Sequence, residues 1–303
     1  MTLGKRRRLG YDEAMTRIAV LTPDPADPSY SGQWPGVLER LTQALSAADV
    51  QADPTPWTEH AKEASGLQSY PLILPVLVWG YHRAHPLWLE ACETWRAAGL
   101  PLANPASVLE WNSDKRYLAR LAERGVPLPT TRWVDRATPE VVAEVFGQTG
   151  AEQLVIKPTV SGGAWRTLRL SLGQAMDDPP EGPAMIQPYL PSIETEGETS
   201  LLYFGGRFSH AVNKRPVGGD FRIQVQFGGQ YARVQPDAAA LTLADRVLSS
   251  IDEPLLYARI DMARDGDAWT LMEAELIEPD FYLGHDPSAG AGFAQAVRER
   301  LDA

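Results

Sequence analysis

The stretch Tyr257-Ala-Arg-Ile-Asp-Met, followed by Trp269-Thr-Leu-Met-Glu-Ala-Glu-Leu-Ile-Glu-Pro, decides which fold this chain is expected to adopt. The residues between the two segments, Ala263-Arg-Asp-Gly-Asp, are typical of a hairpin turn. Because side chains alternate along a strand, Glu273 and Glu275 share one face of the second strand. The hairpin can therefore bring the aspartate of the first segment beside these two glutamates.

That aspartate is Asp261, and it completes a group of three carboxylates. Such a group is self-repelling and costly to bury unless cations lie among the carboxylates. Mg²⁺ takes oxygen ligands of this kind, together with the phosphates of a substrate. The stretch therefore predicts a nucleotide-dependent enzyme.

The composition narrows the class of protein. The chain has 303 residues, enough for two or three small domains, and a net charge of −11, which argues against nucleic-acid binding. No segment is apolar for long enough to cross a membrane. A single cysteine, Cys92, excludes an intramolecular disulfide and fits a reducing cytoplasm. The basic run Lys5–Arg8 near the first methionine is interpreted as a disordered tail.

The first third of the chain alternates strands and helices. Segments 17–22, 72–79 and 102–104 are expected strands, and helices are expected to begin at Pro35 and at Leu87. This alternation implies a small parallel α/β sheet. A further helix is expected after Asn112 or Ser113, either of which could cap it, and before Gly125.

The remainder is expected to be a mostly antiparallel α+β unit. Strands are predicted at 154–158, 167–172 and 184–191, a hairpin at 201–214, and closing helices near 241–249 and 293–301. The expected domains are an N-terminal α/β domain over 14–111, a small lid subdomain over 112–190, and a large subdomain with the magnesium site over 191–303.

Several cationic residues are candidates for phosphate binding. Lys157 ends a predicted strand four residues before Ser161-Gly162-Gly163, and a lysine facing a glycine turn can hold phosphates, although surface exposure is the alternative. Lys115 is expected in the first turn of its helix, where a cation opposes the helix dipole unless it meets an anion.

A second group of candidates follows in the antiparallel unit. Lys214 shares a strand face with His210 and Val212, so partial burial and an anionic partner are expected. His210 could be a general base or a hydrogen-bonded core residue. Arg222 follows a pair of glycines. One of the acidic residues after the Pro188-Tyr-Leu-Pro turn could bind ribose hydroxyls, and a solvated acidic loop is the alternative.

The order of these sites resembles the ATP-grasp superfamily over residues 112–283, preceded by its usual α/β domain. The segments that carry the likeness are Trp79–Arg83, Trp111–Leu118, Gln187–Glu194, Glu196–Leu201, Phe208–Pro216 and Leu271–Pro279. Within the superfamily, the chain resembles first the ligases that close O-ureido-D-serine to D-cycloserine, and more distantly glutathione synthetase. Gly80 stands where the cycloserine-forming type has an acidic residue, and the glycine turn carries Trp165.

The resemblance implies a role for each matching residue. Lys115 and Lys157 would grip the phosphates of ATP, under a loop formed by Ser161, Gly162 and Gly163. The strand with Gln187, Tyr189 and Leu190 would read adenine, and Glu198 would hold the ribose. Lys214, Arg222 and Arg259 would face the transferred phosphoryl group as catalytic residues. Asp261, Glu273 and Glu275 would bind Mg²⁺, with two ions expected.

The expected function is therefore that of a cytoplasmic Mg²⁺- and ATP-dependent ligase. It would activate a small, amino-acid-like carboxylate as an acyl phosphate, for attack by an amine nitrogen of a second molecule or of the same molecule. An ATP-grasp kinase and a non-catalytic nucleotide-binding regulator are the alternatives. No nucleic-acid or membrane partner is expected, and the resemblance leaves open a homodimer.

Overall fold

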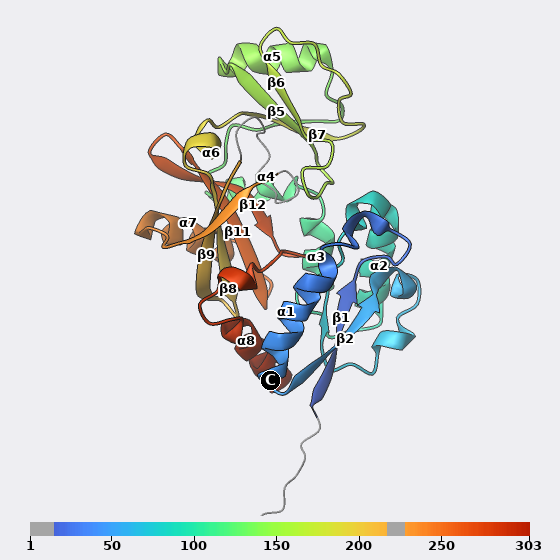
Figure 1. Ribbon diagram of the computed structural model, residues 1–303. Helices are drawn as coiled ribbons and strands as arrows, with labels where there is room; N and C mark the ends of the chain where they lie inside the picture. Colours follow the sequence, from blue (N-terminus) through green and yellow to red (C-terminus); the bar gives the residue numbers. More distant parts are fainter. Residues whose placement is uncertain (1–14, 217–227) are drawn as a thin grey trace, which may run out of the picture.

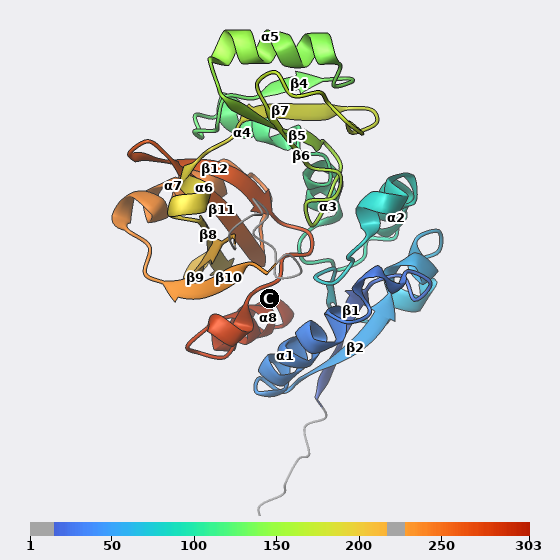
Figure 2. The ribbon, with the colours of Figure 1, turned by 45° about the horizontal axis from the view of Figure 1, so that its top comes forward.

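The structure is a computed structural model that describes residues 15–216 and 228–303 (Figure 1). The basic run Lys5–Arg8 and Arg222 lie outside these residues. The described chain forms three sheets. In Figures 1 and 2 the smaller antiparallel sheet lies at the top, with the larger antiparallel sheet and the parallel sheet side by side below it.

The N-terminal sheet is parallel, as predicted, with the strand order β2-β1-β3. Its strands are β1 (Thr16–Thr22), β2 (Val50–Pro56) and β3 (Ile73–Leu74). The expected strand over 72–79 pairs only at Ile73 and Leu74, although the apolar residues after it stay buried. β2 was not predicted, because its sequence Val-Gln-Ala-Asp-Pro-Thr-Pro is polar and contains two prolines, which read as a loop.

Helices cover this sheet. They are α1 (Trp34–Ser46) and α2 (His85–Ala97), both opened by a proline in their first turn, and α8 (Ala291–Leu301) from the far end of the chain. α8 contacts α1, and the two views show them side by side (Figures 1 and 2). The C-terminal helix therefore shares a hydrophobic core with the first strand, through Ile18, Val20, Leu41, Phe293 and Val297.

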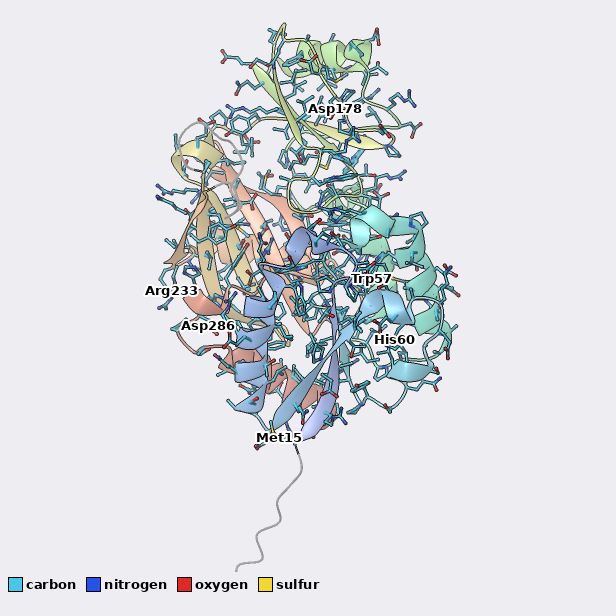
Figure 3. The ribbon with its side chains drawn as sticks, turned by 45° about the vertical axis from the view of Figure 1, so that its right-hand side comes forward. Met15, Trp57, His60, Asp178, Arg233 and Asp286 are labelled. Atoms are coloured by element: carbon cyan, nitrogen blue, oxygen red, sulfur yellow. The ribbon has the colours of Figure 1, made fainter. Side chains whose placement is uncertain are left out.

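The four-stranded sheet has the order β4-β7-β5-β6 and is antiparallel. Its strands are β4 (Arg132–Val134), β5 (Gln153–Pro158), β6 (Leu168–Ser171) and β7 (Ala184–Pro188). One face is covered by α5 (Pro139–Thr149), which Thr138 caps. The core between them consists of residues from 137 to 186 alone. Asp178 marks the outer end of this unit in Figure 3, with Trp57 and His60 on the parallel-sheet side and Arg233 and Asp286 on the other.

The five-stranded sheet has the order β10-β9-β8-β11-β12, also antiparallel. Its strands are β8 (Glu198–Phe204), β9 (Arg207–Arg215), β10 (Gln230–Val234), β11 (Tyr257–Asp265) and β12 (Ala268–Glu275), with α6 (Ser192–Thr195) before β8. The helices α3 (Ala106–Asn112), α4 (Tyr117–Glu123) and α7 (Ala238–Ser249) accompany it. The core of this sheet includes Tyr117, Leu118 and Leu121 of α4.

A buried asparagine, Asn112, and a buried tyrosine, Tyr117, satisfy the outer edge of β12. Asn112 Nδ2 donates to Ala274 O (2.9 Å), and its Oδ1 accepts from Leu276 N (3.0 Å). The Tyr117 hydroxyl bonds to both backbone groups of Ala274. Asn112 or Ser113 was expected to cap the next helix, and that expectation is wrong, because α4 begins after Arg116. Asn112 ends α3, and its side chain is committed to the strand edge, which would otherwise carry unpaired backbone groups.

Asn104 makes the corresponding connection from the parallel sheet. Its Nδ2 donates to Tyr257 O (3.0 Å) and Leu276 O (2.8 Å), and its Oδ1 accepts from Leu256 N (2.7 Å). The residue is fully buried. One side chain therefore ties the N-terminal sheet to both strands of the acidic hairpin. No helix of the described residues has the length and apolar character needed to cross a membrane.

We predict that Asn104→Ala lowers the free energy of unfolding by about 3 kcal/mol, because it leaves several buried backbone groups unpaired. Urea unfolding followed by circular dichroism measures the loss. The exposed residue Gln68 supplies the control Gln68→Ala, which should change stability by less than about 0.5 kcal/mol. A similar small effect of both substitutions would show that Asn104 does not hold the two sheets together.

Candidate active site

The three sheets enclose a cavity of about 330 Å³. Every candidate site residue within the described chain lines it, and Arg222 lies outside the described chain. Those lining residues are Lys115, Lys157, Ser161, Gly162, Gly163, Gln187, Tyr189, Leu190, Glu198, Lys214, Arg259, Asp261, Glu273 and Glu275. Residues separated by up to 160 positions in the sequence thus meet at one place.

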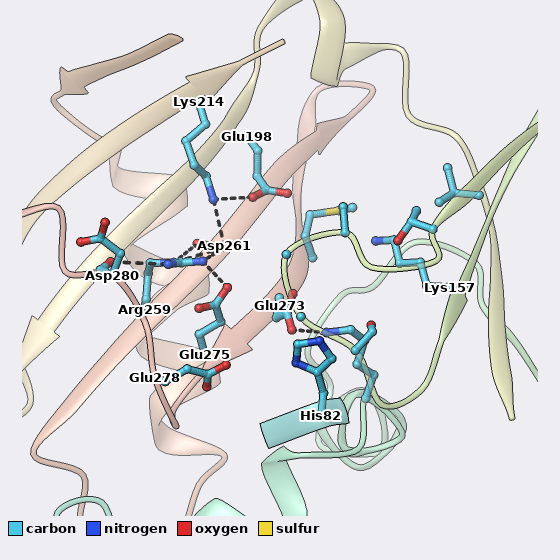
Figure 4. A pocket seen from close by; sticks show the side chains of 18 of the residues that line it. His82, Lys157, Glu198, Lys214, Arg259, Asp261, Glu273, Glu275, Glu278 and Asp280 are labelled. Atoms are coloured by element: carbon cyan, nitrogen blue, oxygen red, sulfur yellow. Dashed lines mark hydrogen bonds and ion pairs between the residues drawn. The ribbon is translucent and has the colours of Figure 1, made fainter. Parts of the chain in front are cut away.

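The acidic hairpin has the register that its sequence predicts. Asp261 of β11 lies opposite Glu273 of β12, and Arg259 lies opposite Glu275. A β-bulge between Asp261 and Met262 shifts the pairing after this point. All four side chains line the cavity, as Figure 4 shows. The alternation of the strands therefore concentrates charge on the face of the sheet that meets the cavity.

Asp261 is buried at the centre of an ionic network. Its carboxylate accepts from Ser200 Oγ (2.6 Å), Lys214 Nζ (3.0 Å) and Arg259 Nη2 (2.9 Å). Burial alone would raise the pKa of this group, but Arg259 and Lys214 outweigh it and hold the pKa below its ordinary value. Lys214 also pairs with Glu198 (2.6 Å), so its expected partial burial beside an anion is confirmed.

The two glutamates of β12 each have a cationic partner. Glu273 accepts from Lys115, and Glu275 accepts from Arg259. Burial nevertheless raises the pKa of Glu275 to about 7, and the negative charges of Asp261 and Glu273 add to this effect. The carboxylates are therefore more crowded with negative charge than the lysine and arginine side chains can fully offset.

The mutual repulsion of these three carboxylates indicates whether the site suits Mg²⁺. Within the described residues, no three His, Cys, Asp or Glu side chains converge as a ready metal site. Asp261, Glu273 and Glu275 nevertheless present oxygen ligands to one cavity, and the raised pKa of Glu275 means that a divalent cation there would relieve electrostatic repulsion. The donor set fits the ion, and its assignment as the magnesium site remains a prediction.

Lys115 does not lie in the first turn of a helix, as was expected. It precedes α4, and its backbone N–H donates to Thr159 O (2.8 Å), which holds it next to the glycine loop. Lys157 of β5 has no ion pair with any described residue, and burial lowers its pKa. Both ammonium groups therefore reach the cavity, and an anion would be a favourable partner for the second one.

The residues expected to read the nucleotide follow β7. Gln187 donates from Nε2 to Thr131 Oγ1 (2.8 Å), which fixes its side chain and leaves its backbone at the cavity. The Tyr189 hydroxyl donates to Glu194 (3.0 Å). Glu198, expected at the ribose, here pairs with Lys214. These contacts place the residues beside one another and leave their nucleotide roles as predictions.

His82 is a lining residue that the sequence did not single out. It is only 6% exposed, and neither ring nitrogen has a hydrogen-bond partner among the described residues. The backbone of Gly162 packs against the imidazole so closely that a Cβ there would lie 3.0 Å from Nδ1. Trp165 of the same loop lies 5.6 Å away, between ring centroids. In the sequence, Tyr81-His82 contributed to the family likeness, but the sequence indicated no role for His82 itself.

The segment before His82 is shaped by Gly80. This glycine has φ of 92°, and a Cβ on it would lie 3.1 Å from Asp27 Oδ2. The Asp27 carboxylate, paired with Arg83 (3.3 Å), thus fills the space that a side chain at position 80 would need.

His210, the candidate general base, is instead a core residue that hydrogen-bonds to Phe281 O (2.9 Å).

Comparison with known proteins agrees with this geometry. No protein-family model matches the chain. The chain is 28% identical over 283 residues to the cycloserine biosynthesis protein DcsG of Streptomyces lavendulae, an alignment that covers 86% of this chain and 92% of that protein. The crystal structure of D-cycloserine synthetase DcsG matches with a TM-score of 0.75 and 25% identity, over 94% of this chain and 99% of that one.

Two further proteins are similar to this chain, one in sequence and one in structure. The glutathione synthetase of Prochlorococcus marinus strain MIT 9313 is 27% identical over 291 residues, 88% of this chain and 86% of that protein. The ATP-grasp ligase PsnB, solved with a precursor peptide and AMPPNP, matches with a TM-score of 0.62 and 14% identity, over 95% of this chain and 98% of that one. The chain is thus similar in sequence to ATP-dependent ligases and similar in fold to an ATP-grasp ligase. The ATP-grasp fold, expected from the sequence, is confirmed.

The buried side chain of His82 makes the free energy of unfolding of this chain depend on pH, and the direction of the dependence follows from its pKa. Burial, together with Arg83 and Lys115, lowers the pKa of His82 from 6.5 to about 4 in the folded protein. Between these values the unfolded chain binds more protons, so the free energy of unfolding decreases as pH falls. From about pH 7 to about pH 5 this contribution falls by about 2 kcal/mol.

Urea unfolding of the wild type and of His82→Asn at the two pH values measures this contribution. The variant should lose less stability on acidification than the wild type, by the stated amount. Glu275, whose raised pKa acts in the opposite direction, cancels in the comparison. His60→Asn, outside the cavity, is the control and should keep the wild-type dependence. An unchanged dependence in His82→Asn would show that His82 is not held neutral by burial.

Proposed function

We propose that this ATP-dependent ligase activates a small carboxylate as an acyl phosphate, which an amine nitrogen then attacks. One observation carries the proposal: four cationic side chains and three hairpin carboxylates meet in a single cavity of an ATP-grasp fold. They are Lys115, Lys157, Lys214, Arg259, Asp261, Glu273 and Glu275. This charge pattern suits the transfer of a phosphoryl group, where positioning and electrostatic stabilisation supply most of the catalysis.

In the first step, an oxygen of the substrate carboxylate bonds to the γ-phosphorus of ATP, and the bond to the β-phosphate oxygen breaks to release ADP. Lys115 and Lys157 would hold the phosphates, since both ammonium groups reach the cavity. Arg259 and Lys214 would offset the negative charge that develops on the transferred group. Arg222 is proposed for the same role, and lies outside the described residues.

In the second step, the amine nitrogen bonds to the carbonyl carbon, phosphate leaves, and the nitrogen loses a proton. The glycine loop of Ser161, Gly162 and Gly163 would cover the reacting groups, because water would otherwise hydrolyse the acyl phosphate. Backbone groups of Gln187–Leu190 would contact adenine, and Glu198 would accept from the ribose. Whether the amine belongs to the same molecule decides between ring closure and intermolecular ligation.

Mg²⁺, for which two ions are proposed, would neutralise charge on the triphosphate when bound, and Asp261, Glu273 and Glu275 would be its ligands. The domains are proposed as 14–111 for the substrate side, 112–190 for the lid and 191–303 for the magnesium site. A cytoplasmic location is proposed, since a single buried thiol, Cys92, suits a reducing compartment that supplies ATP.

Hydroxylamine offers a test that does not require the natural amine. With Mg-ATP and a library of small carboxylates, an acyl phosphate is converted into a hydroxamate, with release of ADP and phosphate. We expect hydroxamate from at least one carboxylate. A phosphorylated product that is stable to hydroxylamine would indicate a kinase instead. Binding of Mg-ADP by calorimetry without any turnover would indicate a regulator.

The acidic hairpin predicts a second result. Glu273→Gln should lower turnover by on the order of 10²–10³-fold, because a carboxylate ligand of the Mg²⁺ that would neutralise the reacting phosphates is lost. Its thermal midpoint should stay close to that of the wild type. The control Glu123→Gln, at the exposed end of α4, should keep full activity. A large loss of stability with normal turnover per folded molecule would instead make Glu273 a structural residue.

A further inference from the structure

Two carboxylates that line the cavity, Glu278 and Asp280, have no part in the proposed reaction, and Glu278 is the one whose backbone is bonded to the N-terminal unit. Glu278 follows β12 and lines the cavity near Glu275 (Figure 4). The carboxylates of Glu198, Asp261, Glu273 and Glu275 each accept from a lysine or an arginine. Glu278 has no ion pair with any described residue. Burial, together with the negative charges of Glu275 and Glu273, raises the pKa of Glu278 to about 8, so a cationic ligand beside this carboxyl group would stabilise its ionised form.

Aromatic side chains of the N-terminal unit line the cavity wall next to the backbone of Glu278. Trp79 donates from Nε1 to the backbone oxygen of Glu278 (3.1 Å), which fixes the indole next to it. The ring of Tyr30 meets Trp79 edge-on, with 5.8 Å between centroids, and both rings line the cavity together with Tyr81. A carboxyl group and aromatic rings that line the same cavity together favour the binding of an organic cation.

The cavity is also polarised between its two sides. Lys157, the cation without a carboxylate partner in the described chain, comes from the four-stranded sheet, whereas Glu278 lies beside the N-terminal unit. Figure 4 shows them at opposite sides of the view. A ligand with phosphate at the first side and positive charge at the second would complement both groups.

A second, independent observation indicates that the N-terminal wall meets a ligand. His82, which follows Tyr81 in the turn Tyr81–Ala84, is more than nine-tenths buried and lines the same cavity. Neither of its ring nitrogens has a partner among the described residues. Buried polar groups are seldom left unpaired, so a polar group of a bound substrate is the expected partner.

We propose that Glu278, with Trp79 and Tyr30, binds a positively charged ammonium group of the carboxylate substrate. The inference rests on the proposed function and specifies its substrate class as amino acids, or other acids that carry an amine. The substrate carboxylate would point toward the phosphoryl-binding cations, and its ammonium group toward Glu278. Glu278 is thus a specificity-determining residue.

Matched pairs of carboxylates test this with the full chain. Each pair joins an amino acid with the deaminated acid of the same skeleton, such as D- or L-alanine with propionate, D- or L-serine with 3-hydroxypropionate, and γ-aminobutyrate with butyrate. Hydroxamate formation with Mg-ATP and hydroxylamine gives kcat/KM for each. The wild type should prefer the amino acid by on the order of 10²-fold or more, because a deaminated acid leaves the buried carboxylate unpaired.

Glu278→Gln should remove most of this preference, mainly by raising KM for the amino acid, while KM for ATP stays the same. Tyr30→Leu keeps the carboxylate but removes an aromatic face, and should reduce the preference in the same direction. This second variant decides the question if Glu278→Gln does not fold. Glu123→Gln should retain the wild-type preference.

Three results would overturn the proposal. Equal turnover of both members of each pair by the wild type would exclude a cation site and leave the ligase function intact. A rise in KM for ATP in Glu278→Gln, with an unchanged preference between pair members, would assign Glu278 to the nucleotide or its metal. Hydroxamate from none of the acids in the panel or in the wider library would instead contradict the proposed function itself.

Discussion

The buried carboxylate of Asp261 needs cations around it, and this requirement organises the site. Arg259 joins Asp261 to Glu275, and Lys214 joins Asp261 to Glu198. The pairs connect four strands of the five-stranded sheet, β8, β9, β11 and β12. Removing one partner from such a buried network is costly, since it leaves the opposite charge uncompensated.

The same network bears on how a triphosphate would bind. Its cations already have carboxylate partners, so phosphate oxygens would replace those partners and the carboxylates would turn to metal ions. Because the cavity already holds desolvated charge, binding would exchange ion pairs and not bury new unpaired groups. The raised pKa of Glu275 shows that the present arrangement is electrostatically incomplete. The fold thus keeps a charged site ready for a highly charged ligand.

Much of the site follows from local sequence rules. Alternation along β12 predicts that Glu273 and Glu275 share a face, and the hairpin turn predicts their meeting with Asp261, because both rules act over few residues. The sequence could not show that Asn112 serves the edge of β12, since the pairing joins residues 162 positions apart and Asn112 also fits a cap rule. The contact between Trp79 and Glu278 could not be predicted either, because these residues are 199 positions apart in the sequence. β2 was missed because its pairing with β1, and not its own composition, makes it a strand.

The self-contained core of the four-stranded sheet has a consequence for dynamics. Two of the buried apolar residues of this sheet lie elsewhere: Met185 joins the neighbouring core, and Val155 lines the cavity. The other buried apolar residues pack with α5 and with one another. Such a unit can open while the rest of the molecule stays folded. Its amide hydrogens would then exchange with solvent water sooner than those of β11, which is buried in the middle of its sheet. A nucleotide bridging Lys157 and Arg259 would couple the two, and would slow exchange on both sides of the cavity together.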